Sequence, residues 1–205
     1  MRAAQEFTAA EAAFVLREPV KAVKKALDEG PVQARLVARL GGRVRAIDEA
    51  DLIYLFAVQA LRDELTPKGR GEFYHALKGA PVEDVHEVRF GRLSVAIDDL
   101  KAEVAERARE LEALAERVEF RPDREAVLKG TDVEVHRVAA LLEGGLTPEE
   151  VCEDYPSLDL EAVAVARAYA ESHPKPGRPY PRTTAKRALK GAGLEALDEV
   201  LDEQG

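Results

Sequence analysis

The first feature with recognisable chemistry is a group of basic side chains near the start of the chain. The protein has 205 residues and a net charge of −9, yet residues 17–45 contain eight basic and three acidic side chains. This local excess attracts phosphate groups, because the field near a surface depends more on nearby charges than on the total charge. The residues expected to contact DNA are Arg17, Lys21, Lys24, Lys25, Arg39, Arg43 and Arg45.

Local sequence signals place these side chains on a helix and a hairpin. Pro19 and Gly30 suit the start and the end of a helix that presents lysines opposite its apolar face. Alternating residues around the glycines at 41–42 predict a β-hairpin. Thr8 is suited to cap an earlier helix, and Asp48 to cap a buried helix that follows the hairpin.

This order of elements resembles the DNA-binding domain of MerR-like regulators over residues 7–77. The resemblance implies a winged helix-turn-helix whose second helix enters the major groove, while the hairpin holds the flanking backbone. The lysines could instead form an ordinary solvated helix face, but the basic hairpin beside them favours DNA. The helix has no Arg, Asn or Gln to hold a base edge, so selectivity is expected from DNA shape, from Gln33 or from other residues.

Residues 81–118 predict a strand pair around Gly91 and then a long charged helix. Apolar residues recur along this helix at intervals of three and four, which is the spacing of a seam against a partner helix. The seam suggests a homodimer, and the alternative is a helix that lies on its own domain. The residues expected to form the dimer contact are Leu100, Val104, Leu111 and Val118.

The next segment, residues 119–173, contains a second helix-turn-helix pattern, but an acidic one. Thr147, Pro148 and Glu150 have capping-box spacing, and a turn around Tyr155 precedes another helix. Residues 146–172 carry seven acidic side chains and one basic side chain. Such a surface repels phosphates, so this pattern is expected to face protein instead of DNA.

The motifs of this segment resemble an antitoxin-associated domain family of formerly unknown function, classed with VapB-like antitoxins. The matching residues read "KGT" at 129–131, "TPEE" at 147–150, "DYP" at 154–156 and "AYA" at 168–170. Asp132 and Glu134 depart from the Arg and Pro that the family favours. The resemblance implies an antitoxin whose partner is a PIN-like toxin, a metal-dependent ribonuclease.

The final segment, residues 174–205, combines prolines and basic residues with an apolar stripe at its end. Proline favours extended structure, and an extended basic peptide suits the clustered carboxylates of a PIN-like active site. The alternative is a solvated chain end. The residues expected to bind the toxin are Arg178, Tyr180, Arg182, Lys186, Arg187, Leu194, Leu197 and Leu201.

The sequence offers no arrangement typical of an enzyme. The four histidines are scattered, Cys152 is single, and there is no metal-binding spacing or phosphate-cradling glycine loop. We therefore expect neither catalysis nor a cofactor nor a metal. No apolar run approaches the length of a membrane span, and no signal-peptide pattern opens the chain, so a cytoplasmic location is expected.

Together these patterns predict a mainly α fold with short β-hairpins. Four parts are expected: a winged helix-turn-helix at 1–80, a strand pair and long linking helix at 81–118, a small hairpin and three-helix domain at 119–173, and an extended tail at 174–205. The expected function is that of a type II antitoxin that neutralises a PIN-like ribonuclease and represses its own operon. The alternative is a MerR-like regulator whose C-terminal half senses a ligand or a protein.

Overall fold

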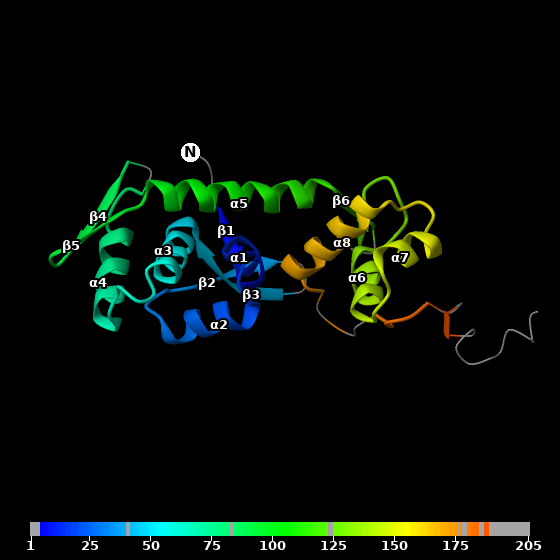
Figure 1. Ribbon diagram of the computed structural model, residues 1–205, viewed down its shortest axis with the longest axis horizontal. Helices are drawn as coiled ribbons and strands as arrows, with labels where there is room; N and C mark the ends of the chain where they lie inside the picture. The colour runs from blue at the N-terminus through cyan, green and yellow to red at the C-terminus, as the bar shows by residue number, and fades with distance from the viewer. Residues whose placement is uncertain are drawn as a thin grey trace, which may run out of the picture. The chain divides into compact units, whose positions relative to one another are not determined.

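The computed structural model describes residues 5–39, 42–82, 84–122, 125–175, 177, 180–184 and 187–188. The protein is mainly α-helical with small antiparallel sheets (Figure 1). It forms two compact units, Met1–Ala113 and Leu114–Gly205. No helix of the described segments is long and apolar enough to cross a membrane.

Unit 1 begins with a short strand, β1 (Glu6–Thr8), and two helices, α1 (Ala9–Leu16) and α2 (Val20–Glu29). Thr8 and Glu11 form the expected capping box at the start of α1. The two helices are joined by a turn in which Arg17 has a left-handed backbone with φ of 53°. Pro19 directly precedes the first turn of α2, as the sequence predicted.

A three-stranded sheet follows, with the strand order β1-β3-β2. The predicted hairpin is present as β2 (Arg35–Arg39) and β3 (Gly42–Asp48), in which Val37 lies opposite Val44. Strand β1 was not expected from the sequence. It pairs with β3 so that Phe7 lies opposite Ile47, and both side chains are buried in the core of unit 1.

The rest of unit 1 consists of α3 (Glu49–Ala60), α4 (Pro67–Lys78), the hairpin β4 (Glu87–Phe90) and β5 (Leu93–Ala96), and most of α5 (Asp98–Glu116). The ring centroid of Phe73 on α4 lies 5.3 Å from that of Phe90 and 6.0 Å from that of Tyr54. These aromatic contacts hold α3, α4 and the hairpin in one core. The hairpin around Gly91 was predicted from the sequence.

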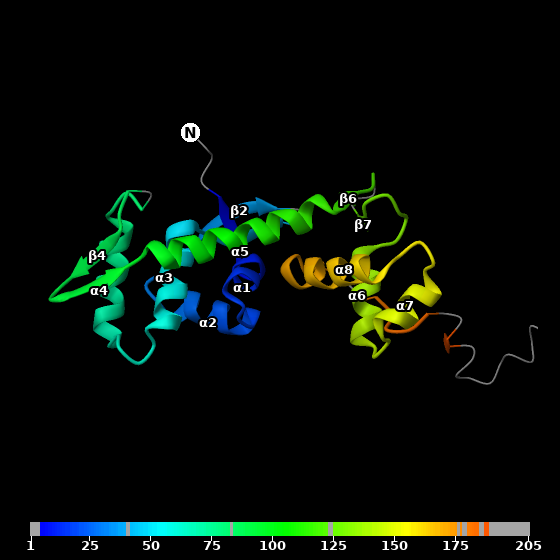
Figure 2. The same ribbon diagram turned by 45° about the horizontal axis from the view of Figure 1, so that its top comes forward.

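The residues expected to form a dimer contact lie on helix α5 or just after it. This helix runs beside α1 and α3 (Figures 1 and 2), where the Arg107 guanidinium donates to the carbonyl of Val15 at 3.1 Å. Val104 and Leu111 are buried in the core of unit 1, and Leu100 packs at its margin. Val118 belongs instead to the core of unit 2. These apolar residues are therefore packed within the chain itself, which favours the alternative of a helix that lies on its own domain.

Unit 2 contains the hairpin β6 (Val118–Phe120) and β7 (Ala126–Leu128), followed by α6 (Val135–Glu143), α7 (Pro148–Asp154) and α8 (Leu160–Ser172). The three helices were expected. Its core side chains come from every element, and the fully buried ones among them are Val135, Val138, Leu141, Val151, Val163 and Ala166. The run "DVEV" at 132–135 is not a strand, because it ends in the first residue of α6 and makes a single bridge from Glu134 to Val127.

Candidate nucleic-acid interface

Helix α2 presents a basic face to solvent. Val23 and Leu27 are buried on one side of the helix, whereas the lysines Lys21, Lys24 and Lys25 are exposed. Lys25 has an acidic neighbour, Glu29, at 3.9 Å, but both side chains are about two-thirds exposed, so this ion pair contributes little. The three ammonium groups therefore remain accessible to an external anion.

The hairpin β2–β3 separates the predicted wing arginines onto two faces. Successive residues of a strand point to opposite sides of a sheet, and the register places Arg43 opposite Ala38 and Arg45 opposite Leu36. Arg43 and Arg45 therefore share one face with the exposed side chain of Leu36. Arg39 lies on the other face, where its guanidinium donates to the carbonyl of Glu6 at 3.1 Å.

Arg45 connects the hairpin to α2. Its Nη1 lies 2.5 Å from a carboxylate oxygen of Asp28, and its Nη2 donates to the carbonyl of Leu27 at 3.1 Å. A cation is favourable at this C-terminal end of the helix, where unpaired carbonyl groups carry partial negative charge. Arg45 was expected to contact DNA. In the structure its guanidinium links β3 to the C-terminal end of α2 through these hydrogen bonds. Neither this role nor that of Asp28 was evident from the sequence.

The remaining residues predicted to contact DNA, Arg17 and Arg43, have different surroundings. Arg17 is exposed in the turn between α1 and α2, and its guanidinium lies 3.8 Å from the carboxylate of Glu110 on α5. Arg43 is exposed on the face of the hairpin that it shares with Arg45. We call the α2 lysines, Arg17 and Arg43 together the basic surface of unit 1.

A buried polar network fixes the start of the hairpin. The Asp51 side chain is 3% exposed, accepts a hydrogen bond from the Tyr74 hydroxyl at 3.0 Å, and lies 3.1 Å from the Lys78 ammonium. Lys78 also bridges to Asp48 at 2.6 Å. The Tyr74 hydroxyl in turn accepts from the backbone N–H of Gln33, just before β2. This network ties the entry of the hairpin to α3 and α4.

The charged groups in this network shift one another's pKa values. Burial raises the pKa of Asp51, and the neighbouring Asp48 carboxylate raises it further. Burial also acts to raise the pKa of Asp48, but the hydrogen bonds from Lys78 and Asp51 and the charge of Lys78 together outweigh it, and the net shift is downward. The pKa of Lys78 is raised, because its two carboxylate partners outweigh the effect of burial. The ammonium is therefore held in its charged form.

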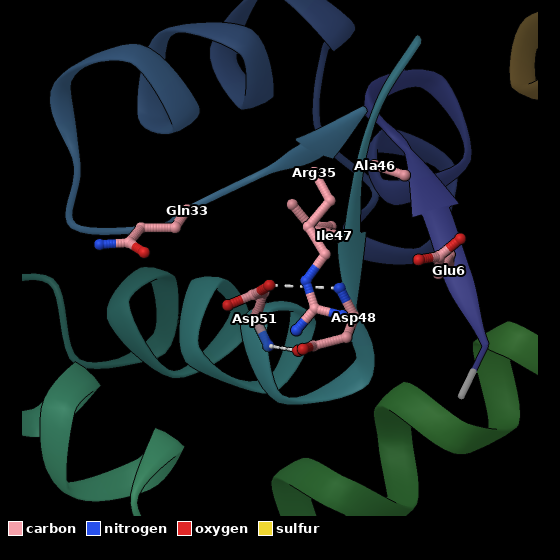
Figure 3. A pocket seen from close by; sticks show the side chains of 7 residues that line it. All are labelled: Glu6, Gln33, Arg35, Ala46, Ile47, Asp48 and Asp51. Atoms are coloured by element: carbon pink, nitrogen blue, oxygen red, sulfur yellow. Dashed lines mark hydrogen bonds between the residues drawn. The ribbon is translucent and has the colours of Figure 1, made fainter. Parts of the chain in front are cut away.

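A pocket opens beside this network, lined by residues that include Glu6, Gln33 and Arg35 (Figure 3). Even counted with the open solvent in front of it, its volume is only about 190 Å³. Pockets that enclose a drug-sized ligand are roughly 300–1,000 Å³, so this hollow is too small for one. Within the described residues, no group of three or more His, Cys, Asp or Glu side chains is placed to hold a metal ion.

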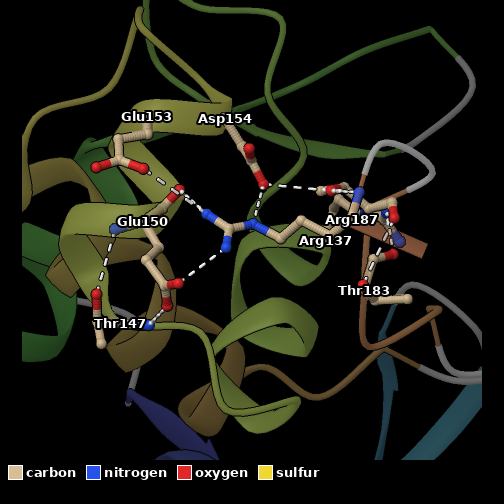
Figure 4. Close-up of polar contacts among 8 residues, drawn as sticks. Arg137, Thr147, Glu150, Glu153, Asp154, Thr183 and Arg187 are labelled. Atoms are coloured by element: carbon tan, nitrogen blue, oxygen red, sulfur yellow. Dashed lines mark hydrogen bonds and ion pairs between the residues drawn. The ribbon is translucent and has the colours of Figure 1, made fainter. Parts of the chain in front are cut away.

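In unit 2, the described part of the tail lies on the chain's own acidic helices. Arg187 contacts the carboxylates of Glu150 and Asp154 on α7 (Figure 4). Arg182 lies 3.6 Å from the carboxylate of Glu143, at the end of α6. The Tyr180 hydroxyl lies within hydrogen-bond distance of Lys175 and Glu125. The other residues predicted to bind a toxin lie outside the described residues: Arg178, Lys186, Leu194, Leu197 and Leu201.

A hydrogen bond between His136 and His173 joins α6 to the end of α8, where the tail begins. His136, the second residue of α6, donates from its Nε2 to the carbonyl of His173 at 2.7 Å. Burial lowers the pKa of His136, and the nearby Lys175 ammonium also acts in that direction. The neutral imidazole therefore fixes the last turn of α8 against α6. The ring of His173 also stacks on Tyr169, with centroids 4.3 Å apart.

Residues 123–170 match the family described as "Protein of unknown function (DUF433)". The chain is similar to the uncharacterized protein y4eO of Sinorhizobium fredii, with 29% identity over 189 residues that cover 85% of each chain. The crystal structure of Rv2018 from Mycobacterium tuberculosis matches 78% of this chain and 95% of its own, with 16% identity and a TM-score of 0.26. A TM-score this low carries no argument about the fold.

Proposed function

We propose that this protein is the antitoxin of a type II toxin–antitoxin system, which binds DNA through unit 1 and a PIN-like ribonuclease through unit 2. The observation that carries the first half is the exposed lysine face of α2 beside Arg43 of the hairpin. Helix, tight turn, basic helix and hairpin are the parts of a winged helix-turn-helix, arranged as in MerR-like regulators. The order of these parts in unit 1 supports that interpretation.

The division of charge between the units supports two different partners. The described residues of α7 and α8 expose acidic side chains such as Glu149, Glu153 and Glu161. Helices of this kind cannot approach phosphates without repulsion. Unit 2 is therefore proposed to contact protein, in keeping with the resemblance of its motifs to antitoxin-associated domains.

The DNA-binding half is tested by salt titration. Replacing the three α2 lysines, Lys21, Lys24 and Lys25, with alanine leaves up to three phosphate groups without a cation. The slope of log affinity against log salt concentration should then fall by roughly 0.9 for each phosphate that is no longer neutralised. The probe is a duplex of the region upstream of the protein's own gene, and binding is measured by fluorescence anisotropy at several salt concentrations.

The control removes the same charge from elsewhere on the surface. Arg89, Arg109 and Arg167 are well exposed and are not part of the basic surface of unit 1. Alanine at these three positions should leave the slope unchanged. Equal slopes for the lysine variant and the parent protein would contradict a DNA role for α2.

The antitoxin half is tested by co-expression with a PIN-like ribonuclease encoded beside the gene, scored as growth. Rescue of growth by the parent protein would support the proposal. Continued arrest by a protein that still binds DNA would favour the other candidate, a MerR-like regulator whose C-terminal half senses a ligand or another protein.

A further inference from the structure

The described residues 180–184 and 187–188 of the tail, here called the strap, lie across the acidic side of unit 2. The centre of the contact is Arg187 (Figure 4). Its Nε donates to Asp154 at 2.9 Å, its Nη1 to the Glu150 carboxylate at 2.8 Å, and its Nη2 to the Glu150 carbonyl at 3.3 Å. Glu153 lies further out, at 3.9 Å from Nη2. All three nitrogens of the guanidinium are thus occupied by α7.

The backbone of the strap also forms hydrogen bonds with unit 2, in addition to those of the Arg187 side chain. Arg137 on α6 donates to the carbonyls of Pro181 at 2.8 Å and Thr183 at 3.0 Å. The Thr184 hydroxyl lies 3.2 Å from the same oxygen of Asp154 that Arg187 contacts. Side chains of α6 and α7 therefore bind both the main chain and the side chains of the strap.

Gly144, which ends α6, allows the strap to approach closely. A Cβ atom at this position would lie 1.9 Å from the carbonyl oxygen of Arg182. Two atoms cannot come this close, so a side chain at 144 and the strap in this position exclude each other. The surface thus has a steric feature that fits the strap and that is independent of its acidic charge.

We propose that the acidic face of α7, formed by Glu150, Glu153 and Asp154, is a docking surface for the chain's own strap and competes with the partner protein for Arg187. The competition rests on the proposed function and on the expectation from the sequence that the basic tail binds carboxylates of the ribonuclease. Arginine binds a carboxylate through its fork of N–H donors. A guanidinium with its three nitrogens committed to α7 must leave that surface before it grips another carboxylate in the same way.

Docking of the strap on its own chain lowers the apparent affinity for the partner protein. When only a fraction of the molecules is competent to bind, the apparent dissociation constant rises in inverse proportion to that fraction. Weakening the contact with α7 should therefore free the strap and tighten binding of the partner. Removing Arg187 itself should weaken it. These opposite directions distinguish competition from a purely structural role of the strap.

The test weakens the docking surface without changing its shape. Glu150→Gln with Asp154→Asn keeps the side-chain volumes, and Gln is also accepted at the third position of a capping box. Glu149→Gln on α7 with Glu171→Gln on α8 removes the same charge from two exposed positions of unit 2 and is the matched control. Gly144→Ala displaces the strap through the clash with Arg182 and leaves every charge in place.

The first measurement needs no partner. Trypsin cleavage after Arg187, followed by mass spectrometry on the full chain, should become about tenfold faster in the Glu150→Gln/Asp154→Asn variant, as expected for the loss of one or two charge-assisted hydrogen bonds. Gly144→Ala should accelerate cleavage similarly, and the control should not. Unchanged cleavage in both variants would overturn the docking surface.

The second measurement is the affinity for the purified ribonuclease encoded beside the gene. The Glu150→Gln/Asp154→Asn variant should bind it more tightly by a factor similar to the gain in cleavage, and Arg187→Ala should bind it more weakly. Faster cleavage with unchanged affinity would overturn the competition and leave the docking intact. If even the parent protein does not bind the ribonuclease, the proposed antitoxin function fails, and the competition fails with it.

Discussion

Replacing Asp28 with asparagine separates two roles that Arg45 can have at the basic surface of unit 1. If Arg45 contacts phosphate, removal of its carboxylate partner releases a cation for DNA. The affinity for any duplex should then rise, and the salt slope should steepen by about 0.9. If Arg45 instead positions α2 against β3 through its hydrogen bonds to Asp28 and Leu27, the same substitution loosens α2 relative to β3.

The structure gives the size of the second effect. The side chains of Asp28 and Arg45 are 61% and 46% exposed, so the ion pair stabilises the fold by no more than about 1 kcal/mol and the variant should remain folded. The effect on recognition is larger, because a displaced helix also displaces the contacts on which a preference for one sequence depends. One mismatched base pair typically costs roughly 1–3 kcal/mol. We therefore expect a roughly tenfold or larger loss of preference for the upstream duplex over a random one.

The assay is anisotropy with the upstream duplex and with a random-sequence duplex of equal length, each at several salt concentrations. Glu29→Gln is the matched control, since it removes the same charge from the adjacent position and Glu29 has only a weak pair with Lys25. The control should bind both duplexes more tightly. If Asp28→Asn behaves like Glu29→Gln, with both affinities raised and the preference kept, Arg45 is not a positioning residue.

Two further predictions concern stability. Leu111→Ala should lower the free energy of unfolding of unit 1 by about 2–5 kcal/mol in urea titrations, because this side chain is buried in its own unit, and it should leave the sedimentation coefficient of the folded protein unchanged. A change from dimer to monomer without loss of stability would instead support a dimer contact through Leu111. Unit 2 should become less stable as the pH falls below about 6.5, the ordinary pKa of histidine, since the unfolded chain takes up a proton there while buried His136 resists it until its lowered pKa is reached. His136→Gln should reduce this pH dependence in thermal unfolding, and an unchanged profile would assign it to other groups.

Signals that act over a few residues were sufficient to predict much of the fold. The hydroxyl–carboxylate pairs of Thr8 with Glu11 and of Thr147 with Glu150 marked the starts of two helices, and both are capping boxes in the structure. Gly91 marked the turn of a hairpin in the same way. Such features depend on neighbours within one turn of chain, so a sequence contains all the information that they need.

Features that depend on distant partners could not be predicted. Strand β1 is too short to show alternation and is defined by its pairing with β3, about forty residues later in the chain. The spacing of Leu100 and Leu111 is the same for a helix on its own domain as for a coiled coil, and only the presence of the unit 1 core decides between them. The basic character of Arg187 likewise indicated a carboxylate partner, but not that α7 supplies it.

The network around Asp51 constrains how this sequence can change over evolutionary time. Loss of Lys78 alone would leave two carboxylates without their cation, and loss of Asp51 alone would leave the Tyr74 hydroxyl and the Lys78 ammonium short of an acceptor. Each single step is costly, whereas replacement of the whole set by apolar residues need not be. These positions should therefore covary among relatives, so that a homologue with an apolar residue in place of Asp51 has also lost the cation at position 78.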